Sequence, residues 1–119
     1  MRELSDIFKA LADETRLQML TLVLERGELC VCDFVGALNI TQSKASRHLR
    51  YLYNSGLLVD RRSGVWIHYQ ISPDLAPEAR TILEAFQLSL DANDKRELMN
   101  RLDVWLDQKV AGGFGTCLG

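Results

Sequence analysis

The sequence is poor in the residue types that mark secreted or membrane-spanning chains. It has three cysteines and two prolines among 119 residues, and no run of 18 or more apolar residues. A membrane-spanning helix needs about 20 consecutive apolar residues, and three cysteines cannot all pair within one chain. Residues 1–6 also lack the apolar core of a signal peptide. These absences predict a cytoplasmic protein with no membrane partner, in which thiols stay reduced.

The composition is that of one globular domain. Hydrophobic residues make up 47% of the chain and charged residues 25%, as in ordinary soluble proteins. Four of the eight glycines lie in residues 112–119. We therefore expect a folded domain over residues 1–111, followed by a flexible glycine-rich tail over residues 112–119 that carries Cys117.

Positive charge is concentrated in the middle of the chain, although the net charge is −2. Residues 41–68 carry five basic groups and one acidic group, whereas the segments on either side are each net acidic. Binding to DNA depends on the charge of the contact surface rather than on that of the whole protein. A solvated basic face is the alternative, but the same segment also has the pattern of a DNA-reading helix.

The hydrophobic periodicity and the turn residues predict the order of elements. Helical patterns cover residues 4–11, 13–27, 29–38 and 41–54. Two β-rich runs, 57–62 and 65–71, follow with a turn at Ser63-Gly64, and two more helical patterns come after Pro77.

A helix-turn-helix followed by a hairpin is a winged helix-turn-helix, mainly α with one β-hairpin. Its second helix, residues 41–54, is placed to enter a major groove. The first and last helices carry wider apolar stripes than a small core needs, and such stripes usually mark an interface. We predict a homodimer formed by the N- and C-terminal helices.

Cys30 and Cys32 lie at the start of the helix that precedes this reader helix. Soft thiolates select thiophilic ions, and a helix N-terminus lowers the pKa of a thiol. Residues i and i+2 of a regular helix point about 200° apart. We therefore expect a bound ion to unwind the first turn and to disturb the spacing of the two reader helices. The alternative is that both cysteines are small buried hydrophobic residues.

The polar side of the reader helix supplies the candidate DNA contacts, since Gln pairs with adenine, Arg with guanine, and Ser with bases or phosphate. His48 has two alternatives, a phosphate contact or a partly buried position with a satisfied hydrogen bond. Trp66 and His68 are expected to stabilise the hairpin by packing. The predicted DNA-binding residues are Thr41, Gln42, Ser43, Lys44, Ser46, Arg47, His48, Arg50, Arg61 and Arg62.

Four segments together resemble the ArsR/SmtB metalloregulators, and more narrowly their arsenical-resistance repressors. They are residues 10–17, 28–33, 46–49 and 64–69, which read ALADETRL, ELCVCD, SRHL and GVWIHY. The resemblance implies a homodimeric winged-helix repressor that leaves its operator, a double-stranded DNA site, when As(III) or Sb(III) binds Cys30 and Cys32.

The chain departs from this pattern at the third ligand. Arsenical repressors of this type often have a third cysteine three residues after the second, where this chain has Val35. Cys117 is the candidate third metal ligand, from its own or the partner subunit, with water, hydroxide or a cellular thiol as alternatives. No histidine lies in residues 69–119, which disfavours the zinc site of histidine and carboxylate ligands that related sensors place between the dimer helices. No cysteine precedes Cys30, which disfavours the cadmium and lead site that uses an N-terminal cysteine.

Other functions stay open at this point. A sensor of another thiophilic metal, such as cadmium, lead or zinc, would use the same fold and the same thiols. A redox switch that oxidises Cys30 and Cys32 is disfavoured because a Cys-X-Cys ring is tight. An enzyme is the least favoured, since there is no Cys-X-X-Cys with a βαβ pattern.

Overall fold

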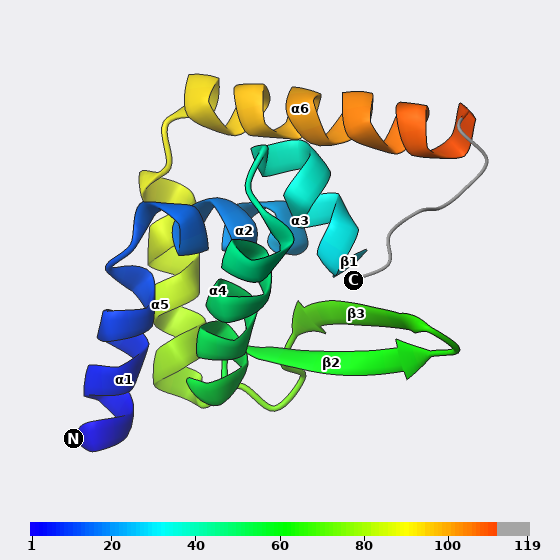
Figure 1. Cartoon of the computed structure of the whole chain (residues 1–119). Coiled ribbons are helices and arrows are strands. Elements are labelled where there is room, and N and C mark those ends of the chain that lie inside the picture. The colour runs from blue at the N-terminus through cyan, green and yellow to red at the C-terminus, as the bar shows by residue number, and fades with distance from the viewer. Residues whose placement is uncertain (112–119) are drawn as a thin grey trace.

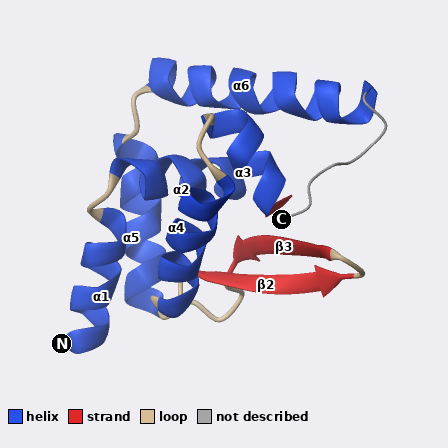
Figure 2. Cartoon of the chain, viewed as in Figure 1, coloured by secondary structure: helices blue, strands red, loops and turns tan. Residues whose placement is uncertain are grey.

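The computed structural model describes residues 1–111, and the predicted flexible tail with Cys117 lies outside the described residues. Within that range the chain forms six helices and three strands, in the predicted order of a winged helix-turn-helix with one additional strand (Figures 1 and 2). None of the described helices is long and apolar enough to cross a membrane. The elements are α1 (Arg2–Leu11), α2 (Glu14–Arg26), β1 (Glu28–Cys30), α3 (Val31–Leu38), α4 (Gln42–Asn54), β2 (Leu58–Ser63), β3 (Trp66–Ile71), α5 (Pro77–Ser89) and α6 (Ala92–Ala111).

The helix boundaries follow from local chemistry. Asp13 caps α2 by accepting a hydrogen bond from the Arg16 amide at 3.0 Å, and Thr41 caps α4 by accepting one from the Lys44 amide at 3.1 Å. These side chains satisfy amides that have no partner inside the helix. Gly27 and Gly56 follow the ends of α2 and α4 with φ of 91° and 86°, in the region that glycine tolerates best. The boundaries predicted for these helices are confirmed.

The sheet has one more strand than the sequence predicted. β1 pairs with β3, which pairs with β2, so the order is β1-β3-β2 and both pairings are antiparallel. Residues 28–30 were expected to lead into or belong to a helix, but their backbone extends along β3 before α3 begins. The hairpin turn is also shifted by one residue: Ser63 pairs with Trp66, and Gly64, with φ of 63°, turns the chain together with Val65.

Helix α6 lies across α2 and α3 and closes the core on that side (Figure 1). Phe34, Leu49, Leu52 and Leu102 are fully buried in the core. Gly36 allows the close approach of α3 and α6, because a Cβ at this position would overlap the indole ring of Trp105. The C-terminal half of α6 is thereby held against the start of α3.

Apolar side chains remain exposed on the outer helices. α1 contacts α5, and Phe8 of α1 is 54% exposed, while Leu88 of α5 is 88% exposed and Val104 of α6 is 56% exposed. Isolated exposed apolar residues are ordinary, but several on neighbouring helices usually indicate an interface. The homodimer was predicted from the apolar stripes of the first and last helices, and it stays a prediction.

Candidate metal site and nucleic-acid interface

Cys30 and Cys32 stand at the junction of β1 and α3. Cys30 is the last residue of β1 and the N-cap of α3, with an extended backbone (φ −91°, ψ 167°), and Cys32 is the second residue of the helix. The two Sγ atoms lie 3.1 Å apart, and both residues are buried. One ion can bond both sulfurs only if they lie within about 4.6 Å, twice a metal–thiolate bond of about 2.3 Å. The pair meets that condition.

This geometry corrects the expectation that a bound ion must unwind the first helical turn. The separation of about 200° applies to two residues inside a regular helix. Cys30 precedes the helix, so its side-chain direction is set by the strand. The sulfurs therefore come together without any change in α3, and the predicted unwinding loses its physical basis.

Asp33 links the cysteine site to α6 through hydrogen bonds. Its Oδ2 accepts a hydrogen bond from the Cys30 amide at 2.9 Å. Its Oδ1 accepts bonds from Trp105 Nε1 at 2.9 Å and from Lys109 Nζ at 3.0 Å. Burial alone would raise the pKa of Asp33, but these hydrogen bonds outweigh burial and hold the pKa below its usual value. Asp33 is thus an ionised anchor between α3 and α6.

The environment of Cys30 raises its pKa, contrary to the expectation from the helix N-terminus. Burial is the largest cause, and the negative charge of Asp33 adds to it. Lys109 Nζ, at 3.5 Å from Cys30 Sγ, acts in the opposite direction but does not compensate. Desolvation disfavours the thiolate more than the helix end stabilises it.

Two tryptophans cover the cysteine pair. Trp66 of β3 and Trp105 of α6 pack against Cys30 and Cys32. Cys30, Cys32 and Asp33 form a group whose candidate ligand atoms lie within 4.8 Å of one another. Both oxygens of Asp33 are already hydrogen-bonded, so its role is to position the site. Sequence reasoning missed Asp33, Trp105 and Lys109, and the only local signal for them was the N-cap-to-N3 spacing of Cys30 and Asp33.

The reader helix α4 presents its polar residues as predicted. Ala45, Leu49 and Leu52 are buried, whereas the opposite side is exposed and carries Gln42, Ser43, Ser46, Arg47 and Arg50. Within residues 1–111, none of these five exposed side chains has a hydrogen bond or an ion pair. They are available to base edges and phosphates. DNA contact by these residues stays a prediction.

His48 does not share this exposed side, and it is 8% exposed. Its Nδ1 lies 3.2 Å from Arg16 NH1, and burial is the largest cause that lowers its pKa. Arg16 also donates to the carbonyls of Lys9 and Ala10 and lies over the ring of Tyr51, so it connects the end of α1 to α4. The structure favours the hydrogen-bonded alternative for His48 over the phosphate contact.

The wing arginines differ from each other. Arg61 donates two hydrogen bonds to Glu28 of β1, at 3.0 and 2.6 Å. Arg62 is exposed and has no side-chain partner in the described part of the chain. Arg62 is therefore available to DNA as it stands, whereas Arg61 must first leave Glu28. Trp66 and His68 are half-buried, as the expected packing role requires.

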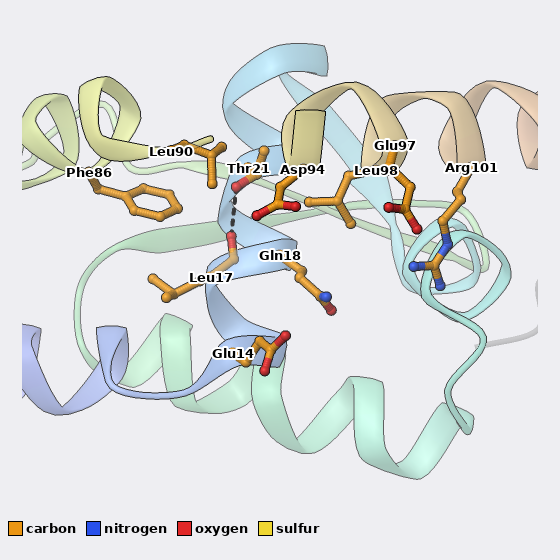
Figure 3. A pocket seen from close by; sticks show the side chains of 10 residues that line it. All are labelled: Glu14, Leu17, Gln18, Thr21, Phe86, Leu90, Asp94, Glu97, Leu98 and Arg101. Carbon is orange, nitrogen blue, oxygen red and sulfur yellow. Dashed lines mark hydrogen bonds between the residues drawn. The ribbon is translucent and has the colours of Figure 1, made fainter. Parts of the chain in front are cut away.

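A separate pocket of about 390 Å³ lies between α2, α5 and α6 (Figure 3). Leu17, Phe86 and Leu98 form its apolar part, and Glu97 and Arg101 line it from α6. It includes no cysteine or histidine and no residue of the reader helix. Its lining therefore does not fit a soft ion, and within residues 1–111 the candidate ligands for one are Cys30, Cys32 and Asp33.

Comparison with known proteins identifies the family. Residues 13–59 match the model described as "Bacterial regulatory protein, arsR family". The arsenical resistance operon repressor of Escherichia coli K12 is 53% identical over 78 residues, which are 66% of this chain and 67% of that protein. The chain belongs to the ArsR family.

Other relatives extend the similarity of this ArsR-family chain. The arsenic resistance transcriptional regulator ArsR2 of Pseudomonas putida KT2440 is 44% identical over 90 residues, or 76% of each chain. Two solved structures share the fold. The AntR antimony-specific transcriptional repressor has a TM-score of 0.59 at 34% identity and covers 70% of this chain and 72% of its own. A homodimeric winged helix-turn-helix domain from Mycobacterium bovis has a TM-score of 0.64 at 29% identity and covers 73% and 77%. Family and fold are those of DNA-binding transcriptional regulators, not enzymes.

Proposed function

We propose that this chain is a homodimeric repressor that binds operator DNA and releases it when As(III) or Sb(III) binds Cys30 and Cys32. Its relatives support the coarser statement of a metal-responsive repressor. The observation that carries the finer one is the 3.1 Å separation of the two sulfurs at the start of α3. This helix packs on the reader helix α4, so the ion site adjoins the DNA-reading element.

The chemistry of the pair suits a trivalent ion that carries hydroxides. Arsenite, As(OH)₃, condenses with two thiols to form two As–S bonds and releases two waters, which leaves one As–O bond. Soft ligands of this kind discriminate against magnesium and calcium. The arsenical and antimony repressors among the relatives are consistent with this choice of ion.

A third sulfur would complete the coordination of a trivalent ion. Val35 is an apolar residue packed against the core and offers no ligand. Cys117 is our candidate for the third ligand, from the same or the partner subunit, and it lies outside the described residues. Water, hydroxide or a cellular thiol remains the alternative at this position.

DNA binding is assigned to α4 and the wing. We propose that Gln42, Ser43, Ser46, Arg47 and Arg50 face the major groove, and that Thr41, Lys44 and Arg62 contact the phosphate backbone. The dimer would be formed by the exposed apolar faces of the N- and C-terminal helices. Two symmetry-related reader helices then contact two half-sites one helical turn apart.

The proposal is tested by measuring DNA release by wild-type protein in the presence of different inducers. Operator fragments selected by the protein from random DNA are labelled, and binding is followed by fluorescence anisotropy under reducing conditions. We expect arsenite and antimonite to raise the dissociation constant by at least about tenfold, a typical allosteric coupling.

The control arms separate the alternatives. Cadmium, lead and zinc test a sensor of another thiophilic metal, and peroxide without any metal tests a redox switch. Release by one of these agents with no response to arsenite or antimonite would contradict the proposal and identify the correct alternative.

A further inference from the structure

The thiol site and the wing share one sheet. Cys30 of β1 pairs with His68 of β3, and His68 pairs with Arg61 of β2. Residues directly opposite in adjacent strands point to the same face of the sheet. A single row of side chains therefore runs from the proposed ion ligand Cys30 to a wing arginine.

Glu28 makes this connection through an ion pair. It lies two residues before Cys30 on β1, and thus on the same face. Its carboxylate accepts two hydrogen bonds from Arg61, at 3.0 and 2.6 Å, and lies 4.0 Å from His68 Nδ1. These bonds hold the pKa of Glu28 below its usual value. Trp66, also on β3, adds a packing contact to the thiol pair.

We propose that Glu28 is a positioning residue that couples ion binding at Cys30 and Cys32 to the wing by holding or releasing Arg61. This inference rests on the proposed function and adds a connection through the sheet to the packing of α3 on the reader helix α4. A paired guanidinium presents its donors either to the carboxylate of Glu28 or to a DNA phosphate, because both acceptors use the same fork of N–H groups.

The direction of coupling follows from competition. An ion that bonds Cys30 fixes the end of β1, and Glu28 is fixed with it because the strand has only three residues. Slippage by one residue would reverse every side chain of β1 to the other face. The ion-bound state therefore favours the Glu28–Arg61 pair, and the DNA-bound state favours the Arg61–phosphate contact. A ligand shifts an equilibrium only through such a differential interaction.

The test compares Glu28→Gln with Asp60→Asn. Asp60 is an exposed wing carboxylate on β2 that pairs with Tyr69 in the sheet and has no ion pair within residues 1–111. The two variants change the net charge equally. The measured quantity is the ratio of operator dissociation constants with and without saturating arsenite. We expect this ratio to fall at least about fivefold in Glu28→Gln and to stay within about twofold of wild type in Asp60→Asn.

Two further readouts distinguish positioning from a structural effect. The thermal midpoint should stay close to wild type in Glu28→Gln. Arsenite affinity without DNA, measured by tryptophan fluorescence, should fall by no more than the factor lost from the DNA ratio, because the coupling is reciprocal. The logarithm of the operator binding constant falls linearly with the logarithm of the salt concentration. Arg61→Gln should make this slope shallower by about 0.9 for each lost phosphate contact, whereas Glu28→Gln should not. Adding Glu28→Gln to Arg61→Gln should change the arsenite ratio no further.

The possible failures are separable. A wild-type ratio near one contradicts the proposed function, and the coupling through Glu28 fails with it. A large wild-type ratio that Glu28→Gln leaves unchanged overturns the coupling alone, as does an effect of Glu28→Gln that persists fully in the Arg61→Gln background.

Discussion

Replacing Cys30 or Cys32 by serine is expected to abolish release of operator DNA by arsenite while operator binding itself is retained. Each substitution removes one of two sulfurs that lie 3.1 Å apart. Loss of a residue that only hydrogen-bonds to a metal ligand commonly lowers metal affinity by about 10–100-fold. Loss of a ligand itself should therefore raise the arsenite concentration needed for half-maximal release by more than about 100-fold. Neither cysteine lies on the exposed side of α4, so the DNA-reading surface is unchanged.

The measurement is the same anisotropy titration, with Cys117→Ser beside the two variants. Thermal unfolding of each serine variant checks that the buried substitution has not unfolded the domain. If Cys117 is the third ligand, its variant should respond with reduced sensitivity rather than not at all. Normal release by both Cys30→Ser and Cys32→Ser would place the sensing site elsewhere in the chain.

Replacing Arg47 by alanine is expected to weaken operator binding by about 5–150-fold, corresponding to 1–3 kcal/mol for a lost bidentate base contact. Arg47 is exposed on the side of α4 opposite the buried residues Ala45 and Leu49. Its guanidinium has no hydrogen-bond or ion-pair partner within residues 1–111. The loss should depend on the base pair that Arg47 contacts, so the preference at one operator position should relax. Arsenite affinity should be unchanged.

The matched control is Arg96→Ala on α6, which removes an equal charge from an exposed helix. Within residues 1–111, the side chain of Arg96 donates a hydrogen bond only to Asn93 of its own helix. Its removal should change operator affinity by no more than about twofold at moderate salt. Equal losses in the two variants, without a change in base preference, would indicate a general charge effect and contradict the assignment of α4 as the reader helix.

The fold could be predicted where local chemistry decides it. Asp13, Thr41, Gly27 and Gly56 fix helix ends through side-chain caps and positive φ, and these signals are visible in a single sequence. Strand β1 was missed because three residues become a strand only by pairing with β3, some 40 positions later. The local sequence does not indicate such a distant pairing partner.

The choice of Cys30 and Cys32 as a candidate site was made from the sequence, but the geometry that brings their sulfurs together was not expected, and their role as ligands stays a prediction. The spacing of Cys30 and Cys32 identified the thiol pair, but the assumption of a regular helix gave the wrong side-chain directions. The hydrogen bonds of Asp33 reach residues 72 and 76 positions away, on α6. Nothing in the local sequence marks Trp105 and Lys109 as neighbours of the thiols. The raised pKa of Cys30 likewise depends on burial that only the folded chain provides.

In the reader helix, the sequence predicted which side is exposed but not the surroundings of every residue. Its amphipathic pattern predicted the exposed side correctly, since period alone determines which residues face the core. His48 lies at the edge of that pattern, and its position was settled by Arg16 from another helix. Arg61 was predicted as a DNA contact from charge, and its pairing with Glu28 was invisible without β1.

X-ray absorption at the arsenic edge of the arsenite-loaded protein tests the central claim most directly, because it counts the atoms bonded to arsenic. We predict at least two sulfur neighbours in the wild type and one fewer in both Cys30→Ser and Cys32→Ser. A further loss in Cys117→Ser would identify the third ligand. A shell of oxygen alone, or a sulfur count that neither Cys30→Ser nor Cys32→Ser changes, would contradict the account.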